Sequence, residues 1–348
     1  MSSHSNVVRG FASDNYAGIC PEAMAALEEA NQGHAVAYGE DPWTQRLTTL
    51  IQKIFECECS VYLTFNGTAA NSLALAHLCG SYQGILCHEQ SHLLVDECGA
   101  PSFFAGGARL IPVSGVNGKL NLEALEEKIK ERTDIHSQLP RVVSLAQVTE
   151  CGTVYTPDEL RQIQGLCQKY GLYFHMDGAR FANAVASLKL SPAELSWKVG
   201  VNVLSLGFTK NGVPMGDLVI FFDSKLAKGF EFRCKQGGQL ASKSRFLAAP
   251  MVGLLENGAW LRNAAHANSM AMALESQLTS ISGLKIMHPR QANALFLDFS
   301  EEVAEKLHQK GWRFYSFGVS GYRLMTAWDH TQEDVDRFVR DLKSVFKG

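Results

Sequence analysis

The chain has 348 residues, 46% of them hydrophobic and 19% charged, which is enough apolar material for a large core. Its formal net charge of -3 gives no basic field, so nothing in the composition points to a nucleic acid or an anionic membrane as a partner. The length exceeds that of a usual single domain. We therefore expect two domains and small ligands.

The longest stretch without Asp, Glu, Lys or Arg runs from Cys59 to His88, but Asn, Gly, Thr and Gln interrupt it, so we expect no membrane span. The start of the chain lacks the apolar core of a secretory signal. The nine cysteines are accordingly interpreted as reduced thiols of a cytoplasmic protein. No C-x-x-C pair is present, and we expect no metal.

A mobile N-terminal arm over residues 1–20 is expected to precede a large α/β domain over residues 21–250. Periodicity and helix-start signals predict helices over 21–31, 41–56, 69–77, 122–131 and 157–170. Apolar runs predict strands over 61–65, 85–87, 109–113, 142–148, 172–176 and 201–204. This alternation favours a mostly parallel sheet, with ligands at the carboxyl ends of its strands.

The pattern changes near Pro250, where we place a domain boundary. A long helical stretch follows, and then strands are predicted over 284–287, 294–299 and 322–327, with helices starting at 301 and spanning 332–346. Residues 251–348 are thus expected to form a smaller α+β domain.

Lys210 stands in the turn that follows the strand predicted over 201–204. Neutralising a buried lysine at pH 7 costs about 4–5 kcal/mol, a cost that is seldom accepted without a use. A neutral amine suits attack on a carbonyl to form a Schiff base. Taken alone, however, the stretch fits a solvated loop lysine better.

The segment N-G-T-A-A-N, from Asn66 to Asn71, lies between a predicted strand and a predicted helix. Unpaired N–H groups at a helix start can bind a phosphate, Gly67 permits a close approach, and the Thr68 hydroxyl adds a donor. The same three letters N-G-T also make an ordinary turn followed by a helix cap.

Two further segments end predicted strands. In F-H-M-D-G-A-R, Asp177 can pair with a protonated ring nitrogen and Arg180 with a substrate carboxylate, although the two can also simply pair with each other. His92, in E-Q-S-H-L-L-V-D-E, can stack on a planar cofactor and exchange protons near pH 7, although an isolated histidine is usually structural or exposed.

Together and in this order, the segments resemble the threonine aldolase family of pyridoxal-phosphate enzymes, in the aspartate-aminotransferase fold group. The resemblance covers nearly the whole chain. It runs through S-D-N-Y at Ser13, Y-G-E-D-P at Tyr38, N-G-T-A-A-N at Asn66, the His92 segment, D-I-H at His136, D-G-A-R at Asp177, F-T-K-N-G at Lys210, R-C-K-Q-G-G at Arg233 and Y-R-L-M-T at Tyr322.

The resemblance implies a fold type I large domain with a mostly parallel seven-stranded sheet, and pyridoxal 5'-phosphate as the cofactor. Lys210 matches the lysine that holds the cofactor covalently, Asp177 the partner of its ring nitrogen, and His92 the ring that stacks on it. Asn66, Gly67 and Thr68 match the phosphate cradle.

Other matched positions concern the substrate and the subunit interface. Ser13, Arg180 and Arg323 match positions that hold the substrate α-carboxylate, and His136 matches a histidine near the substrate hydroxyl. Glu97 and Tyr38 match positions around the substrate. The segment at Arg233 is similar to one that crosses towards the cofactor of a neighbouring subunit, which implies a homodimer or homotetramer with the active site at the interface.

Two departures from the family pattern stand near the site. The better-known members carry S-K-G-L-G-T-P where this chain has T-K-N-G-V-P, and E-N-T-H in the strand that here contains A-Q-V-T-E. The second departure places Gln147, Thr149 and Glu150 where they are expected to alter substrate preference.

The resemblance implies retro-aldol cleavage of β-hydroxy-α-amino acids such as L-threonine, L-allo-threonine or phenylserine to glycine and an aldehyde. A histidine, either His92 or His136, is expected to accept the hydroxyl proton. A β-eliminating lyase or an aminotransferase of the same fold group would share the lysine and the aspartate. A relative that binds cofactor without catalysis is a further alternative.

Overall fold

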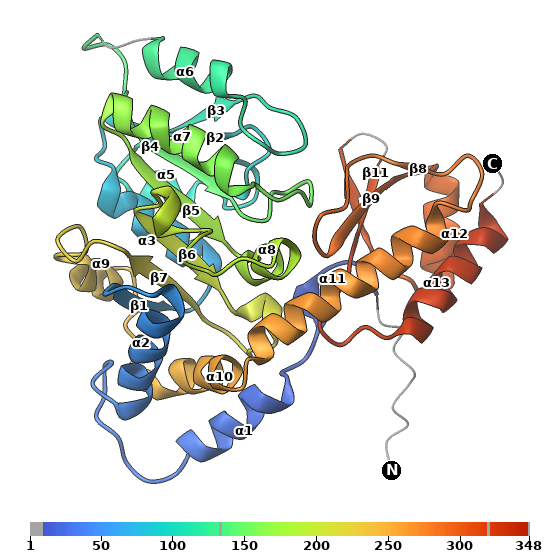
Figure 1. Ribbon diagram of the computed structural model, residues 1–348, viewed down its shortest axis with the longest axis horizontal. Coiled ribbons are helices and arrows are strands. Elements are labelled where there is room, and N and C mark those ends of the chain that lie inside the picture. The colour runs from blue at the N-terminus through green and yellow to red at the C-terminus, as the bar shows by residue number, and fades with distance from the viewer. Residues whose placement is uncertain (1–9, 132–133, 319–320, 347–348) are drawn as a thin grey trace.

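Strands whose side chains are mostly buried form the central sheet of the larger part of the molecule in this computed structural model (Figure 1), which describes residues 10–131, 134–318 and 321–346. Within those residues the sheet has seven strands in the order β1-β7-β6-β5-β4-β2-β3. Their bounds are β1 Ser60–Thr64, β2 Gln83–His88, β3 Arg109–Val113, β4 Leu139–Ala146, β5 Tyr173–Gly178, β6 Val203–Gly207 and β7 Asp217–Phe221.

Neighbouring strands from β3 to β6 run parallel, whereas β7 is antiparallel to both β6 and β1. Only residues 208–216 separate β6 from β7. A parallel return needs a crossover of a dozen residues or more, so this short connection requires the antiparallel pairing. The structure confirms the prediction of a mostly parallel sheet. The sequence analysis, however, assigned no element to the segment D-L-V-I-F that forms β7.

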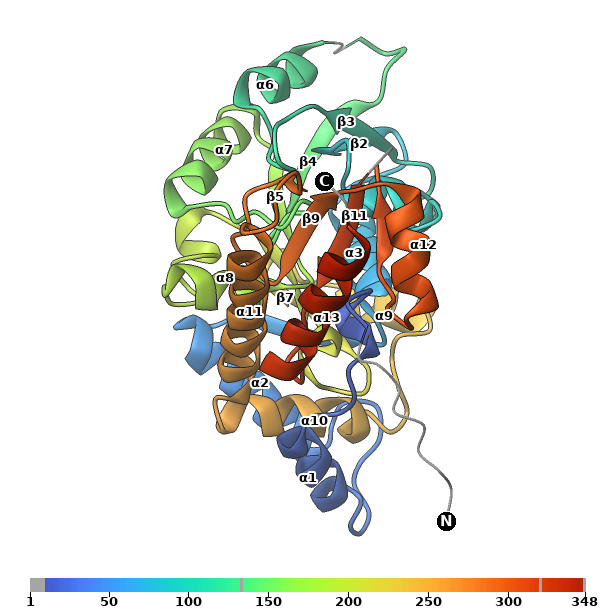
Figure 2. The same ribbon diagram turned by 90° about the vertical axis from the view of Figure 1, so that its right-hand side faces the viewer.

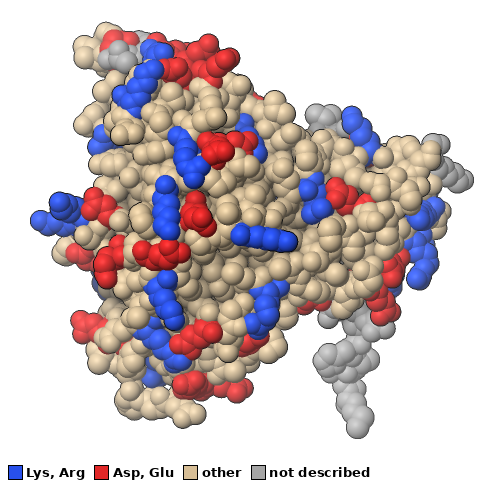
Figure 3. All heavy atoms as spheres, viewed as in Figure 1, with Lys and Arg blue, Asp and Glu red and all other residues tan. Residues whose placement is uncertain are grey.

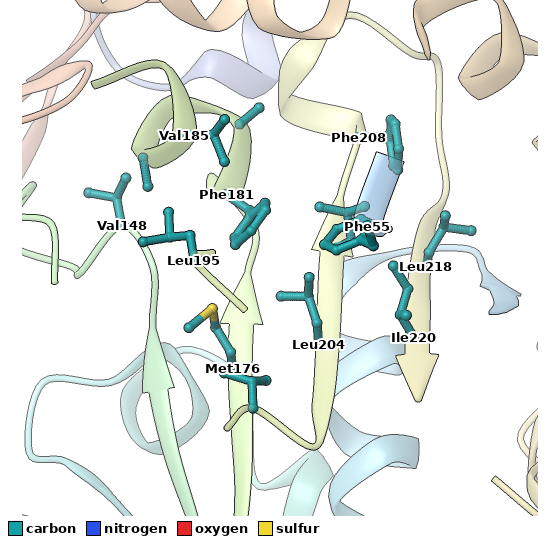
Figure 4. Close-up of a cluster of buried hydrophobic side chains, with 14 of the residues drawn as sticks. Phe55, Val148, Met176, Phe181, Val185, Leu195, Leu204, Phe208, Leu218 and Ile220 are labelled. Carbon is teal, nitrogen blue, oxygen red and sulfur yellow. The ribbon is translucent and has the colours of Figure 1, made fainter. Parts of the chain in front are cut away.

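Helices cover both faces of this sheet. One face packs against α2 (Pro42–Phe55), α6 (Leu122–Lys130), α7 (Pro157–Tyr170) and α8 (Phe181–Leu188). Figure 4 shows Met176, Leu204 and Leu218 of neighbouring strands within this core, beside Phe181 and Val185 of α8. The other face packs against α3 (Gly67–Leu78), α5 (Ala100–Phe104) and α9 (Phe230–Gln236).

A pair of long helices connects this part of the molecule to the smaller one. Helix α10 (Arg245–Glu256) packs against α1 (Pro21–Ala30) and α2, and α11 (Ala259–Leu278), orange in Figure 1, continues to the smaller unit. Pro250, the expected boundary, lies inside α10. Residues of the large core extend along α11 to Ala264, and those of the second core begin at Ala271.

The smaller unit pairs an antiparallel sheet with helices (Figure 2). In its described residues the strand order is β10-β11-β9-β8, with β8 Lys285–Ile286, β9 Ala294–Asp298, β10 Tyr315–Phe317 and β11 Gly321–Met325. Helices α11, α12 (Glu301–Gln309) and α13 (Gln332–Val345) pack on it. The described residues also form the short helix α4 (His92–Val95) and three 3-10 turns, η1 (Asp14–Tyr16), η2 (Trp197–Val199) and η3 (Thr209–Asn211).

The described part of the N-terminal arm is built into the second core, unlike the mobile arm that the sequence analysis expected. Phe11 is fully buried, its ring stacks on Trp312, and its carbonyl accepts a hydrogen bond from Met325 at 2.8 Å. Burial of such a ring stabilises by roughly 1.5–3 kcal/mol. Residues 1–9 of the expected arm lie outside the described residues.

The outer surface shows no dominant sign of charge on the face drawn in Figure 3, where acidic and basic side chains are interspersed. This agrees with the small net charge of the chain. Throughout residues 10–131, 134–318 and 321–346, none of the helices is long and apolar enough to span a bilayer.

Candidate active site

A cavity of about 1010 Å³ opens where the carboxyl ends of β4, β5 and β6 meet β10 and β11. Ligands of parallel α/β sheets gather at this edge. The cavity is lined by most of the residues that the sequence analysis singled out: Ser13, Asn66, Gly67, Thr68, His92, Glu97, Asp177, Arg180, Lys210 and Arg323.

Lys210 lies in the 3-10 turn η3 (Thr209–Asn211) between β6 and β7. The first residue of β7, Asp217, holds this turn because its Oδ1 accepts the backbone N–H groups of Phe208 and Thr209 at 2.8 and 3.2 Å. Gly212 closes the turn at a φ of +109°, where a Cβ would also approach Cys20 Cβ to 2.9 Å. The lysine is therefore presented by a fixed turn.

Lys210 is half-buried and lies at the wall of the cavity. Burial lowers its pKa, Arg180 lowers it further, and Asp14, Asp177 and Asp217 oppose this shift. No hydrogen bond or ion pair of the amine occurs within the described part of the chain. A buried amine whose charged form is disfavoured is suited to nucleophilic attack on a carbonyl.

Helix α3 points its N-terminus into the cavity, with Gly67 and Thr68 as its first residues. Asn66 caps this helix, since its Oδ1 accepts the N–H of Ala69 at 2.9 Å. The first N–H groups of a helix have no partner inside it, and the helix dipole adds positive potential. A helix start of this kind can hold a phosphate or another anion.

An asparagine that the sequence analysis did not single out joins two carboxylates of the site. Asn71, one turn into α3, donates from Nδ2 to Asp177 Oδ2 at 2.9 Å and to Glu97 Oε1 at 3.0 Å. The second oxygen of Asp177 accepts the N–H of Ala179 at 2.9 Å. The orientation of the Asp177 carboxylate is therefore determined by hydrogen bonds to both of its oxygens.

His92 and Glu97 form a hydrogen-bonded pair beside Asn71, which bonds the same oxygen of Glu97. The Nδ1 atom of His92 lies 2.8 Å from Glu97 Oε1, and the hydrogen bond to Glu97 raises the pKa of His92. Glu97 is only 3% exposed, and burial raises its pKa even though the bond to His92 acts in the other direction. With Nδ1 occupied, Nε2 is the nitrogen of His92 that is left for proton transfer.

Three residues predicted to bind a carboxylate line the same cavity, but one of them is already in an ion pair. Arg180 makes a bidentate pair with Asp14 at 2.7 and 2.9 Å. Arg323 donates to the Ala12 carbonyl at 3.2 Å, and its buried Nε has no partner among the described residues. The Ser13 hydroxyl caps η1 by accepting the N–H of Asn15 at 3.1 Å. Arg323 is therefore the more available guanidinium.

The departures at 147–150 have different locations. Gln147 is fully buried and bonds the backbone of Tyr155 with both ends of its amide, away from the cavity walls. Thr149 and Glu150 line the cavity. Thr149 Oγ1 bonds Thr153 Oγ1 at 2.8 Å, whereas Glu150 Oε1 accepts the backbone N–H of His92 at 2.8 Å.

His136 is not brought to the cavity of this chain, which corrects the prediction that it lies near the substrate hydroxyl. It is exposed in the segment before Leu139, where β4 begins, whereas the cavity lies at Ala146, where β4 ends. Eight residues of strand extend over about 25 Å. A side chain cannot span that distance.

Tyr38 and Arg233 also lie outside the cavity walls of this chain. Lys235 Nζ stands 5.0 Å from the centre of the exposed Tyr38 ring, so the loop of Tyr38 and helix α9 are neighbours. Arg233 is half-buried in α9. Their predicted roles, which depend on a second subunit, stay predictions.

The sequence analysis missed Asn71, Asp14 and Asp217 as members of the site. The spacing of Asn71 from Gly67 was a usable signal, because residues four apart share one face of a helix. Asp14 and Asp217 act through partners that a local pattern does not reveal. Among the described residues, no cluster of His, Cys, Asp and Glu is arranged to hold a metal ion.

The family described as Beta-eliminating lyase matches residues 10–302 of the chain. A low specificity L-threonine aldolase from Pseudomonas sp. (strain NCIMB 10558) is 53% identical over 97% of this chain and 98% of that relative. An alanine racemase from Cochliobolus carbonum is 30% identical over 85% of this chain and 78% of its own.

Among solved structures, a threonine aldolase from Leishmania major superposes with a TM-score of 0.90 at 26% identity, covering 96% of this chain and 98% of that one. A serine palmitoyltransferase from Sphingomonas wittichii, at 15% identity and a TM-score of 0.74, shares the fold over 96% of this chain and 86% of its own.

Proposed function

The chain belongs to the β-eliminating lyase family and is similar to a low specificity L-threonine aldolase over nearly its whole length, so we propose that it cleaves β-hydroxy-α-amino acids to glycine and an aldehyde with pyridoxal 5'-phosphate. The observation that carries the proposal is one cavity in which three groups converge: the Lys210 amine, which has no partner among the described residues, the Asp177 carboxylate held by hydrogen bonds, and the N-terminus of α3. L-threonine and L-allo-threonine are the first candidate substrates.

The residues of the cavity fit the proposed cofactor. Its aldehyde requires an amine, its phosphate requires an anion site, and its ring nitrogen requires a carboxylate. Lys210, the helix start at Gly67 and Thr68, and Asp177 supply these three groups. Two buried oxygens beside this site, Asn71 Oδ1 and Glu97 Oε2, have no partner among the described residues and can accept hydrogen bonds from a ligand.

The bound cofactor supplies an electron sink for the electron pair released at Cα. Asp177 contributes by keeping a proton on the ring nitrogen, because a carboxylate stabilises the adjacent positive charge. Asn71 and the Ala179 N–H hold the carboxylate in place for this task. Lys210 contributes an amine that can be displaced by the substrate amine.

Two guanidinium groups orient the substrate. Arg323 offers a buried Nε that has no partner among the described residues, and Arg180 adds positive charge while Asp14 holds it in position. A carboxylate bound here is fixed relative to the lysine and the ring. Orientation of this kind selects which bond at Cα lies in the position to break.

His92 contributes a ring that Glu97 orients through Nδ1, leaving Nε2 to hold or move a proton. The hydrogen bond to Glu97 is the largest cause of the raised pKa of His92, and the negative charges of Asp177 and Glu97 raise this pKa further. His92 is therefore expected to serve every reaction that needs a proton beside the cofactor.

A product assay tests the proposal. The protein, loaded with pyridoxal 5'-phosphate, is incubated separately with L-threonine, L-allo-threonine and phenylserine, and glycine and aldehyde are quantified. Equimolar glycine and aldehyde are expected. Formation of a keto acid and ammonia, or of an exchanged amino group, would instead assign the chain to an eliminating lyase or an aminotransferase.

Elimination is the second candidate, favoured by the description of the matching family. It would use the same lysine and aspartate but break a bond at Cβ to a leaving group. L-Serine and L-cysteine as substrates, with pyruvate as the measured product, distinguish it from aldol cleavage.

A further inference from the structure

The proposed cleavage requires a group that accepts the proton of the β-hydroxyl, and His136 does not reach the cavity of this chain. Glu150 does. It follows β4 at the carboxyl edge of the sheet and lines the cavity beside Thr149 and Gly152. Nothing in the cofactor site described above uses its carboxylate.

Glu150 is held at a defined point between His92 and the carboxylate-binding arginines. Its Oε1 accepts the His92 backbone N–H at 2.8 Å, and its charge is felt by Arg180. One oxygen is thus anchored at the start of α4, and the residue lines the same cavity as Arg180 and Arg323. The backbone N–H of Glu150 itself is a further donor to this carboxylate, and no other residue of the described part of the chain bonds it.

Burial raises the pKa of Glu150 to about 7, with Asp177 contributing in the same direction and the His92 N–H opposing it. A glutamate in this range changes between acid and carboxylate at neutral pH, which suits it to both accept and return a proton. The titratable groups whose charges act on Glu150, or on which it acts, are Cys87, His92, Cys151, Tyr155, Asp177 and Arg180.

We propose, resting on the function proposed above, that Glu150 is the acid–base residue for the β-hydroxyl of the substrate. Its carboxylate takes the hydroxyl proton as the C–O bond becomes the aldehyde C=O and the Cα–Cβ bond breaks. The electron pair of that bond stays with the glycine fragment, which takes up one proton at Cα. Protons and electrons therefore balance, and Glu150 returns its proton before the next cycle.

The inference divides the proton transfers between two residues. Glu150 handles the hydroxyl, which only the β-hydroxy substrate carries. His92 stands next to the cofactor and serves steps that all amino acids share. The two roles can be measured separately, because exchange of the glycine α-hydrogen with solvent requires no hydroxyl.

The decisive variant is Glu150→Gln, whose amide oxygen still accepts the His92 N–H but cannot titrate. We expect kcat for threonine and allo-threonine to fall by about 10²–10⁴-fold with little change in KM, as for loss of a general base. The limb of the kcat/KM pH profile near 7 should disappear. Exchange of the glycine α-hydrogen in D2O, followed by NMR, should persist, and so should the visible absorption of bound cofactor and the melting temperature.

Two further variants complete the experiment. Glu89→Gln changes an exposed glutamate outside the cavity walls. It should leave the cleavage kinetics, the pH profile, the glycine exchange, the cofactor absorption and the melting temperature unchanged. Glu150→Ala should recover cleavage when formate is added, since a small carboxylate can replace the missing base. The Glu150→Ala variant keeps the test valid if Glu150→Gln folds poorly.

Several results would overturn the inference. Cleavage by Glu150→Gln at the wild-type rate with an unchanged pH profile would remove Glu150 from proton transfer. Parallel loss of cleavage, glycine exchange and cofactor absorption, without rescue by formate, would make its role structural. Absence of aldehyde with the wild-type protein would refute the proposed function itself, and the role of Glu150 with it.

Discussion

The pKa of Lys210 depends on burial and on its charged neighbours. Burial and Arg180 lower its pKa, whereas three nearby carboxylates limit the effect. A lysine in solution would be protonated and unreactive at pH 7. The proposed nucleophile is therefore a property of the turn at the end of β6 and of the groups around it.

Lys210→Ala should abolish covalent attachment of the cofactor while some binding through the phosphate site persists. The wild-type protein should be yellow, and borohydride reduction followed by peptide mass spectrometry should locate the cofactor on Lys210. Lys53→Ala, at an exposed position of α2 outside the cavity walls, is the control and should remain labelled. Labelling of a different lysine in the wild-type protein would refute this assignment.

Asp177→Asn should leave the fold largely intact and lower kcat by roughly 10²–10³-fold, the loss typical when one preorganised electrostatic contact is removed. The amide cannot keep a proton on the ring nitrogen as a carboxylate does. Steady-state kinetics and far-UV circular dichroism check the two parts. Turnover near the wild-type value would exclude Asp177 from the chemistry.

Glu97→Gln tests how His92 is positioned. The hydrogen bond to the Glu97 carboxylate raises the pKa of His92, so removing that charge should lower this pKa. His92 then stays neutral down to a lower pH. If a step needs neutral His92, the acidic limb of the kcat/KM profile should therefore move to lower pH. NMR titration of the histidine ring gives the same shift independently of activity. An unmoved limb and an unmoved titration would show that Glu97 has no influence on His92.

At the level of elements, the N-terminus of α3 is both a structural and a chemical feature. Asn66 caps it, and the Ala-rich residues behind Thr68 are buried on the sheet from Ala70 to Leu78. The helix therefore cannot shift without disturbing the core, so its first N–H groups are held rigidly towards the cavity. This rigidity is what an anion site requires.

Thr68→Val removes a hydroxyl at this helix start while keeping the shape of the side chain. A hydrogen bond to a charged group contributes about 1.5–3 kcal/mol, so the Kd for pyridoxal 5'-phosphate should rise roughly tenfold to 150-fold. Equilibrium dialysis with the purified protein measures it. Thr48→Val, whose hydroxyl bonds the Thr44 carbonyl within α2, is the control and should bind normally. Equal affinities of the two variants would refute a phosphate contact by Thr68.

At the scale of the whole molecule, α9 and the loop around Tyr38 form a surface whose predicted role needs a second subunit. Phe232 is 73% exposed on α9, and Tyr38 is exposed beside Lys235. Large exposed aromatic residues in one region are typical of an interface. We predict that residues 233–238 lie at a contact between two copies of the chain.

A complementation experiment checks this prediction. Lys210→Ala and Arg233→Ala should each be inactive or weak as homodimers, because the first lacks the amine and the second lacks a residue reaching the neighbouring site. After subunit exchange, half of the dimers contain one intact site, so about a quarter of wild-type activity should return. Sedimentation establishes the size of the species. A fully active monomer, or no recovery on mixing, would contradict the interface.

Most helices and strands, and several residues that line the cavity, could be predicted from the amino-acid sequence. Local periodicity was sufficient for most strands and helices, because alternation and helical spacing reflect which side chains are buried. The placement of Lys210 and Asp177 after apolar strands was sufficient to bring them to one edge of a parallel sheet. The segment of β7 was assigned no element, although its apolar run is buried much as that of β6 is.

Only the tertiary structure decided how the site is completed. Asp14 and Arg180 pair across 166 residues of chain, Asn71 reaches Asp177 across 106, and His92 meets Glu150 across 58. The sequence placed His136 near the substrate, but β4 separates it from the cavity by the length of the strand. Hydrogen bonds and pKa values depend on distances between atoms, and the packing of the sheet against α3 and the smaller unit sets those distances, which no local pattern records.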